Sequence, residues 1–257
     1  MDFVKMEALG NDFIVVEGPL DDPTSEEVRA WCRRRFGIGA DGLLEATRRE
    51  GAVGMRYWNA DGHEAEICGN GLRCVARLAA ARGWVEGSSF VVETAVGPRR
   101  VEVRDDMVRA ELGRPYGFRT DVLAVAGTEV RPVGLGNPHA VLFVDDVGAA
   151  PVGDLGPRIG TDAIFPGGTN VEFAEVVDDG RLRLRVWERG VGETLACGSG
   201  AAAAVVVAQR AGRVAERVVV ELPGGELVVE VDGDVVWIEG PANFVFTGRV
   251  PAELPSS

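Results

Sequence analysis

The sequence contains two related copies of one stretch, and this duplication limits the folds open to the chain. Residues 56–71, RYWNADGHEAEICGNG, align with residues 185–200, RVWERGVGETLACGSG, with arginine, tryptophan, glutamate, cysteine and both glycines in register. Upstream, the string LGN occurs at residues 9–11 and again at 135–137. A nearly constant offset across half of the chain indicates one internal duplication and not a solenoid of short repeats. We therefore predict two similar halves that face each other.

The length and composition of the chain are sufficient for two such halves. With 257 residues, 46% of them hydrophobic, each half of about 120 residues can bury its own core. We place the N-terminal half at residues 1–115, with the tail 243–257 as a segment that returns to it, and the C-terminal half at residues 116–242. The Gly- and Pro-containing interval at residues 113–120 is the expected boundary.

The local patterns predict an α/β (α+β) fold in which each half is a mostly antiparallel sheet curled around a central helix. The two central helices are expected at residues 72–82 and 200–211, each followed by a glycine, Gly83 and Gly212, as is usual at a helix end. A third helix is expected at residues 25–35. Alternating apolar residues predict strands, at residues 55–58, 89–93, 99–104, 182–187, 218–222, 227–231 and 235–239.

Charge and composition exclude several classes of function. The net charge of -13 disfavours binding to nucleic acid, which requires clustered positive charge. The first ten residues lack the features of a secretion signal, and no apolar run approaches the roughly 18 residues of a membrane span. We expect a cytoplasmic protein without membrane or nucleic-acid partners.

The titratable side chains offer little for a metal or a cofactor. Four cysteines without a CxxC or histidine-rich spacing indicate neither zinc nor a disulfide framework. Lys5 is the single lysine, so a pyridoxal phosphate enzyme would have to form its Schiff base there. We expect no metal and no cofactor.

Cys68 and Cys197 each precede a predicted central helix. Unpaired N–H groups and the helix dipole at such a position favour a thiolate, and the adjacent glycines leave room for a bound anion. If the two helix ends face each other, a carboxylate between them places its α-carbon between two thiols. One thiolate then removes the α-proton and the other thiol delivers a proton to the opposite face.

A structural interpretation of the cysteines competes with this one, because buried free cysteine often acts as a small hydrophobic residue. The duplication argues against it for Cys68 and Cys197, since packing alone gives no reason for both copies to keep Cys-Gly-x-Gly. For Cys32 and Cys74 we retain the structural interpretation; the position that matches Cys74 in the second copy is Ala203.

Eight strings in order along the chain resemble the diaminopimelate epimerase family. They are LGNDF (9–13), GADGLL (39–44), NADG (59–62), CGNGLRC (68–74), GNPH (136–139), GTNVEF (168–173), ERG (188–190) and ACGSGA (196–201). The resemblance implies an isomerase that interconverts LL- and meso-2,6-diaminopimelate without a cofactor, in the synthesis of lysine and peptidoglycan precursors. It also suggests a homodimer.

The resemblance further implies roles for individual residues. Cys68 and Cys197 match the acid/base pair, with Cys197 as the base for the LL substrate, and His139 and Glu188 match residues that tune the thiols. The positions that match substrate-binding residues are Asn11, Asn59, Gly69, Asn70, Asn137, Asn170, Glu188, Arg189, Gly198 and Ser199. Arg189 can hold a distal carboxylate and Glu188 an ammonium group.

The sequence departs from the family pattern at two places. Glu7 and Ala8 stand where many members have histidine, and Gly42 stands where some have a glutamine that reaches the substrate. A glycine has no side chain for that contact, so position 42 is a doubtful part of the site.

Three alternatives stay open. A proline or hydroxyproline racemase shares the two-thiol chemistry, although a cyclic imino acid has no second charged end for the Asn, Glu and Arg side chains to bind. A thiol-disulfide redox or sensor protein would join Cys68 to Cys197 reversibly. A catalytically inactive binding module is disfavoured because both cysteines are present.

Overall fold

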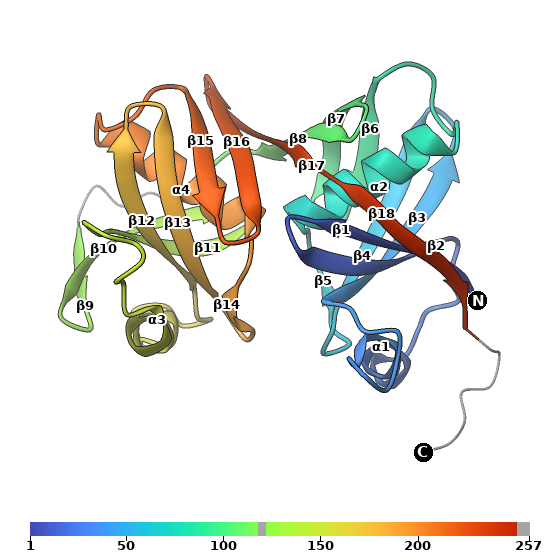
Figure 1. Cartoon of the computed structure of the whole chain (residues 1–257), viewed down its shortest axis with the longest axis horizontal. Coiled ribbons are helices and arrows are strands. Elements are labelled where there is room, and N and C mark those ends of the chain that lie inside the picture. The colour runs from blue at the N-terminus through green and yellow to red at the C-terminus, as the bar shows by residue number, and fades with distance from the viewer. Residues whose placement is uncertain (118–121, 251–257) are drawn as a thin grey trace. The chain divides into compact units, whose positions relative to one another are not determined.

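The computed structural model describes residues 1–117 and 122–250, and these form two compact units. Unit 1 comprises Met1–Ala110 and the described segment that begins at Pro241, and unit 2 comprises the described residues between Glu111 and Gly240. In its described residues each unit is dominated by β-strands and has two helices (Figure 1). No helix in the described residues is long and apolar enough to cross a membrane.

Unit 1 is a mostly antiparallel sheet. Its strands pair in the order β18–β1–β2–β3–β4–β6–β7–β8, with the short β5 on the end of β4; only the pairs β2–β3 and β4–β6 are parallel. The strands are β1 (Asp2–Ala8), β2 (Asn11–Glu17), β3 (Gly42–Arg49), β4 (Ala52–Asn59), β5 (Glu64–Ala65), β6 (Ser89–Thr94), β7 (Gly97–Arg104), β8 (Met107–Gly113, which runs past the unit boundary) and β18 (Asn243–Arg249). Its helices are α1 (Ser25–Cys32) and α2 (Gly69–Ala81).

Unit 2 repeats this topology strand for strand. Its order is β9–β10–β11–β12–β13–β15–β16–β17, with β14 on the end of β13 and only β11–β12 and β13–β15 parallel. The strands are β9 (Leu123–Val125), β10 (Thr128–Leu135), β11 (Asn137–Phe143), β12 (Asn170–Asp178), β13 (Arg181–Glu188), β14 (Gly192–Thr194), β15 (Arg217–Leu222), β16 (Gly225–Asp232) and β17 (Val235–Pro241). Its helices are α3 (Val152–Gly160) and α4 (Gly198–Arg210). The predicted fold class, two related halves that each curl a mostly antiparallel sheet around a helix, is confirmed.

The central helix of each unit has the composition of a buried helix. Ala and Val occupy most positions of α4, and its residues from Ala201 to Ala208 are all buried. A helix that is apolar on every face is stable only inside a protein, and α4 packs against β10, β11, β12, β13 and β16. The helix ends before Gly212, which has a φ of 67° that favours glycine. In unit 1, α2 packs in the same way against β1, β2, β3, β4 and β7.

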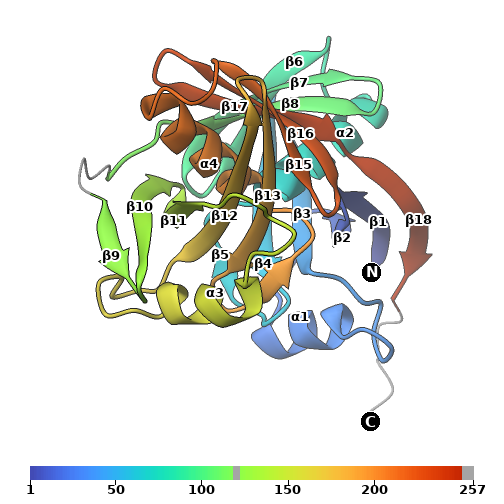
Figure 2. The same ribbon diagram turned by 60° about the vertical axis from the view of Figure 1, so that its left-hand side comes forward.

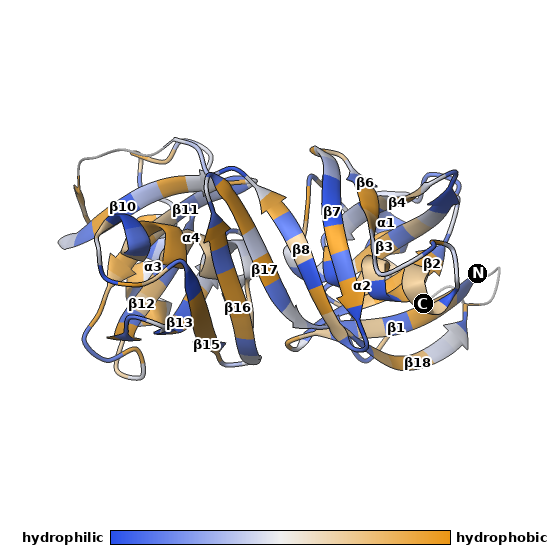
Figure 3. Ribbon diagram, turned by 90° about the horizontal axis from the view of Figure 1, so that it is seen from above, coloured by the Kyte–Doolittle hydropathy of each residue, from blue (hydrophilic) through white to orange (hydrophobic). Residues whose placement is uncertain are grey.

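The strands beside each central helix are covered on both faces. Val171 and Phe173 of β12 belong to the apolar cluster that also holds Val152 and Ile159 of α3, and α3 lies across one end of β12 and β13 (Figure 2). Because successive side chains of a strand point to opposite faces, Glu172 lies on the other face, toward α4. Other strands, such as β16, alternate between hydrophobic and hydrophilic residues (Figure 3).

The structure corrects several predicted bounds. Both central helices begin earlier than predicted, at Gly69 and Gly198, so each cysteine is itself the N-cap residue. The helix predicted at residues 25–35 ends at Cys32, because the chain there turns back, with the N–H groups of Ile38 and Gly39 bonded to the carbonyl of Trp31. Residues 59–67, which their polar composition predicts to be a loop, contain the short strand β5.

The C-terminal tail and the predicted boundary are only partly described. The strand β18 pairs antiparallel with β1 from Asp2↔Arg249 to Glu7↔Asn243. The rest of the predicted tail, residues 251–257, and residues 118–120 of the predicted boundary lie outside the described residues. The limits proposed for the two halves, 1–115 and 116–242, stay a prediction.

Two glycines of α3 provide a matched test of the packing in unit 2. A Cβ at Gly156 would lie 2.6 Å from Cβ of Trp187 on β13, whereas a Cβ at Gly153 would have no atom within 4 Å. We expect Gly156→Ala to lower the free energy of unfolding by about 1–3 kcal/mol through overpacking. Gly153→Ala is expected to leave it unchanged or raise it by up to about 1 kcal/mol, since alanine is the better helix former. Urea unfolding of both variants measures the difference, and equal midpoints would contradict the packing described here.

Candidate active site

In unit 1, Cys68 forms the N-cap of α2. Its φ and ψ of -132° and 117° are extended, and its Sγ accepts a hydrogen bond from the N–H of Gly71 at 3.4 Å. Its Sγ also donates to Oδ1 of Asn11 at 3.8 Å. A negative charge on this sulfur would therefore be stabilised by the first turn of the helix.

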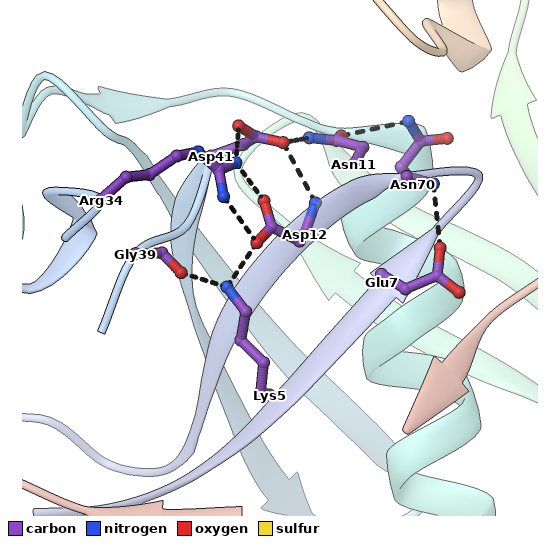
Figure 4. Close-up of polar contacts among 9 residues, drawn as sticks. Lys5, Glu7, Asn11, Asp12, Arg34, Gly39, Asp41 and Asn70 are labelled. Atoms are coloured by element: carbon purple, nitrogen blue, oxygen red, sulfur yellow. Dashed lines mark hydrogen bonds and ion pairs between the residues drawn. The ribbon is translucent and has the colours of Figure 1, made fainter. Parts of the chain in front are cut away.

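Asn11 is held next to Cys68 from two sides. Its Oδ1 accepts a hydrogen bond from Nδ2 of Asn70 at 3.1 Å, and its Nδ2 donates to Oδ2 of Asp41 at 2.9 Å (Figure 4). Three residues predicted to form part of the site, Asn11, Cys68 and Asn70, are thus brought together in unit 1.

An ion-pair network fixes Asp41 and also engages the single lysine. Arg34 bonds to both Asp41 and Asp12, at 2.7 and 2.6 Å (Figure 4). Lys5, which is 5% exposed, donates to Asp12 at 2.6 Å and to the carbonyl of Gly39. The Lys5 ammonium group is therefore committed to this network.

Arg73 is a buried cation beneath Asn70 that the sequence analysis missed. It has no exposed surface, and its Nη2 donates to Oδ1 of Asn70 at 2.9 Å while its Nε donates to the carbonyl of Pro241 at 3.4 Å. Burial lowers the pKa of Arg73 to about 10. The signal that could have revealed Arg73 is a charged residue within the apolar helix pattern LRCVAR.

Asn59 and Gly42 lie opposite each other on β4 and β3. Oδ1 of Asn59 accepts a hydrogen bond from the hydroxyl of Tyr57 at 2.7 Å. A Cβ at Gly42 would lie 2.5 Å from Cε2 of Tyr57 and 2.6 Å from the carbonyl oxygen of Trp58. Tyr57 thus occupies the space that a longer side chain at position 42 would need, which gives a physical reason for the glycine.

In unit 2, Cys197 is the N-cap of α4 and is more deeply buried. Its Sγ accepts a hydrogen bond from the N–H of Gly200 at 3.3 Å and lies 3.5 Å from the hydroxyl of Ser199. The residue is 6% exposed.

The helix N-terminus alone led us to expect a lowered pKa for this thiol. Instead, burial raises the pKa of Cys197 well above its usual value, and the carboxylates of Glu188 and Glu172 raise it further, against the smaller opposing effects of Ser199 and the Gly200 N–H. Desolvation of a thiolate outweighs one turn of helix dipole.

Asn170, Glu188 and Arg189 lie at neighbouring strand ends. Oδ1 of Asn170 accepts a hydrogen bond from the N–H of Arg189 at 2.8 Å, and its Nδ2 donates to the carbonyl of Pro138 at 3.2 Å. Glu188 accepts a hydrogen bond from the hydroxyl of Thr194 at 2.5 Å, and the exposed Arg189 donates to the carbonyl of Gly167 at 2.9 Å. Asn170 therefore positions the turn that carries Arg189.

His139 lies on β11 and is paired with a carboxylate that the sequence analysis did not single out. Its Nδ1 lies 2.6 Å from Oε1 of Glu172, and neither side chain has exposed surface. Nε2 of His139, Oε2 of Glu172 and Oδ1 of Asn137 are buried, and the part of the chain that the structure describes provides them with no hydrogen-bond partner. The signal that could have revealed Glu172 is a glutamate within the apolar strand NVEFA, at a position that faces α4.

The surroundings of the other two cysteines support the structural interpretation. Cys32 and Cys74 are buried, and burial raises the pKa of Cys32 to about 12 and raises that of Cys74 further. Within the described residues, no three His, Cys, Asp or Glu side chains are grouped so as to hold a metal ion.

Comparison with solved structures shows that the fold of this chain is shared by other proteins. A probable proline racemase from Agrobacterium radiobacter K84 superposes with a TM-score of 0.74 at 18% identity, over 98% of this chain and 93% of that one. At that identity the likeness shows the shared fold alone.

Sequence comparison is more specific. The family model described as diaminopimelate epimerase matches residues 3–117 and 132–245. A diaminopimelate epimerase from Alkalilimnicola ehrlichii is 44% identical, over 96% of this chain and 98% of the relative, and one from Moorella thermoacetica is 42% identical, over 98% and 100%. The chain belongs to the diaminopimelate epimerase family.

The electrostatics of Cys197 can be tested by its reactivity. Because burial and two carboxylates raise its pKa, we expect Cys197 to react slowly with a small thiol reagent at pH 8 and to react faster as the pH rises above 9, the usual pKa that it exceeds. Glu188→Gln removes one of the charges and should accelerate the reaction at pH 8 by about three- to tenfold. Peptide mass spectrometry resolves each cysteine. Glu193→Gln is the control, since Glu193 is paired with Arg185; equal acceleration in that variant would refute the electrostatic explanation.

Proposed function

We propose that the protein interconverts LL- and meso-2,6-diaminopimelate by a two-base mechanism, with Cys68 and Cys197 as the two acid/base groups. The observation that carries this proposal is that each of two topologically matched units caps its buried central helix with one cysteine. Membership of the family, and relatives above 40% identity that bear the name diaminopimelate epimerase, support it.

The proposed chemistry is a proton transfer at each face of the α-carbon. With the LL substrate, the Cys197 thiolate removes the α-proton and becomes a thiol, and the electron pair of the broken C–H bond delocalises into the carboxyl group. The Cys68 thiol then protonates the opposite face and becomes a thiolate. The reverse reaction exchanges these roles.

The proposal requires the halves 1–115 and 116–242 to close on the substrate, with the site in the cleft between them. Closure would expel water and strengthen the electrostatic interactions within the site. The backbone N–H groups of Gly69 and Asn70 at one helix end, and of Gly198 and Ser199 at the other, would hold the reacting carboxylate.

The distal end of diaminopimelate requires its own recognition. We assign its carboxylate to Arg189 and its ammonium group to Glu188, with Asn11, Asn59, Asn137 and Asn170 as further polar contacts. The buried Oδ1 of Asn137 has no hydrogen-bond partner among residues 1–117 and 122–250, so a donor such as an ammonium group would satisfy it. His139 and Glu188 are proposed to tune the two thiols.

The racemase alternative rests on the two thiols and the shared fold, whereas the sequence similarity to diaminopimelate epimerases covers nearly the whole chain. The redox alternative would use the same two cysteines in a reversible disulfide. Neither explains the buried His139–Glu172 pair and the strand-end cluster of Asn170, Glu188 and Arg189.

We place the protein in the cytoplasm, in the synthesis of lysine and peptidoglycan precursors, acting without a cofactor and without nucleic-acid or membrane partners. The net charge of -13 supports the exclusion of nucleic acid. A homodimer is also proposed; Phe244, Val245 and Phe246 on β18 are 43–55% exposed and would suit a subunit contact.

Proton NMR of the reduced protein with LL-2,6-diaminopimelate in deuterium oxide tests the proposed reaction. We expect loss of the α-proton signal and formation of the meso isomer without added cofactor, and no reaction with L-proline. Cys68→Ala and Cys197→Ala should each lower the rate of inversion by about 100- to 10,000-fold, the range for loss of one acid/base group.

Cys74→Ala is the matched control, because Cys74 lies in the same helix as Cys68 and unit 2 has alanine at the matching position. It should retain nearly the activity of the unsubstituted protein. Turnover of L-proline in place of diaminopimelate would support the racemase alternative, and no exchange on either substrate would refute both enzymatic functions.

A further inference from the structure

The two units differ sharply beneath their central helices, although their strands match. In the parallel pair β2–β3, Phe13 lies opposite Gly42 and Val15 opposite Leu44; in the matching pair β11–β12, His139 lies opposite Asn170 and Val141 opposite Glu172. His139 therefore takes the place of Phe13, and Glu172 takes the place of Leu44. All four side chains are buried.

The carboxylate of Glu172 borders the proposed catalytic thiol. A Cβ at Gly200 would lie 2.9 Å from Oε1 of Glu172 and 3.2 Å from Sγ of Cys197, whereas a Cβ at the matching Gly71 would lie 3.0 Å from Cδ2 of Leu44. Unit 2 thus has a buried imidazole and a buried acid at the two positions where unit 1 has apolar side chains.

A buried carboxylate is costly unless it is paired and hydrogen-bonded. Burial raises the pKa of Glu172, while the His139 imidazole and the backbone N–H groups of Ala140 and Glu172 lower it. The first turn of α4, which runs from Gly198, further favours a negative charge beside Gly200. The pKa of Glu172 is raised overall, because burial outweighs these groups. The 2.6 Å contact nevertheless gives an ionised Oε1 of Glu172 a donor, the hydrogen on Nδ1 of His139.

We propose that Glu172 is a positioning residue for the epimerisation: its carboxylate holds His139 with the hydrogen on Nδ1, so that Nε2 is the ring atom that gains and loses a proton. This inference rests on the proposed function for its catalytic consequence. Nε2 of His139 is buried and has no partner in the described residues, as an atom reserved for a substrate or a thiol would be.

The surroundings of the pair contain few competing charges. On β13 the nearest acid is Glu188, which acts on Cys197. Opposite His139, β10 presents the apolar Val133, and the buried part of α4 from Ala201 to Ala208 is uncharged. The hydrogen on His139 is therefore placed by Glu172 and not by another partner.

The chain has two histidines, which makes the state of His139 directly measurable. Nitrogen-15 NMR of the imidazoles distinguishes a protonated from an unprotonated ring nitrogen, and His63→Gln identifies the signals of the exposed His63. We expect Nδ1 of His139 to carry a hydrogen in the unsubstituted protein. An unprotonated Nδ1, with the proton on Glu172, would overturn the inference.

Two substitutions extend the test to catalysis. Glu172→Leu installs the residue that unit 1 has at this position, and Glu172→Gln keeps the volume and a hydrogen-bonding group but removes the charge. Glu172→Leu should lose the uniform Nδ1–H signal and lower kcat by about 10- to 100-fold with a smaller change in KM, because the wrong tautomer blocks proton exchange at Nε2. Glu172→Gln should lose less of both, because its amide oxygen can still accept the hydrogen on Nδ1.

The Leu variant separates positioning from simple packing. If it folds, by circular dichroism, and keeps both kcat and the His139 spectrum, Glu172 fills space only and the inference fails. Glu175→Gln, on the same strand but bonded to Val147 and Arg183, should change neither readout. If the unsubstituted protein shows the Nδ1–H signal but does not epimerise diaminopimelate, the proposed function fails while the positioning by Glu172 stands.

Discussion

The N-terminus of a buried helix, capped by a cysteine sulfur, is the interaction on which the candidate site in each unit depends. The N–H group of Gly71 or Gly200 donates to the sulfur at 3.4 or 3.3 Å. This contact requires the helix to begin immediately after the cysteine. Glycine suits the first turn, because a Cβ would lie 3.0 Å from Cδ2 of Leu44 at position 71 and 2.9 Å from Oε1 of Glu172 at position 200. The curled sheet of each unit then removes most of the helix from water, and it buries Cys197 more completely than Cys68.

Burial of the helix also decides the electrostatics of the thiol. In unit 2 desolvation and two carboxylates oppose ionisation of Cys197 more strongly than the helix end favours it. In unit 1 a buried cation, Arg73, lies in the first turns of the helix and bonds to Asn70. The two units thus share a backbone but differ in the charges near the cysteine, with carboxylates in unit 2 and a cation in unit 1. Such a difference suits two thiols of which one removes a proton and the other delivers one.

Much of the architecture was predictable from the duplication and from residue patterns. The Ala- and Val-rich helix ended by Gly212, the alternating strands and the cysteines at helix starts were all visible in the sequence. The exact helix start was not, because Gly69 and Gly198 are poor helix formers that the N-cap contact of the cysteine compensates.

The residues of the candidate site were predictable, but the contacts between them were not. The resemblance supplied Asn11, Asn70, His139 and Asn170, yet partners far apart in the sequence, such as Glu172 for His139, follow from strand register. The raised pKa of Cys197 also could not be inferred, since it depends on burial by strands that a linear pattern does not reveal.

The central claim is that one thiol can exchange the α-proton but that two are needed to invert the centre. The most direct test follows Cys68→Ala with LL-2,6-diaminopimelate in deuterium oxide, measuring exchange and stereochemistry together. We expect the Cys197 thiolate of this variant still to exchange the α-proton of the LL isomer, while almost no meso isomer forms. Formation of the meso isomer at the rate of the unsubstituted protein would contradict it.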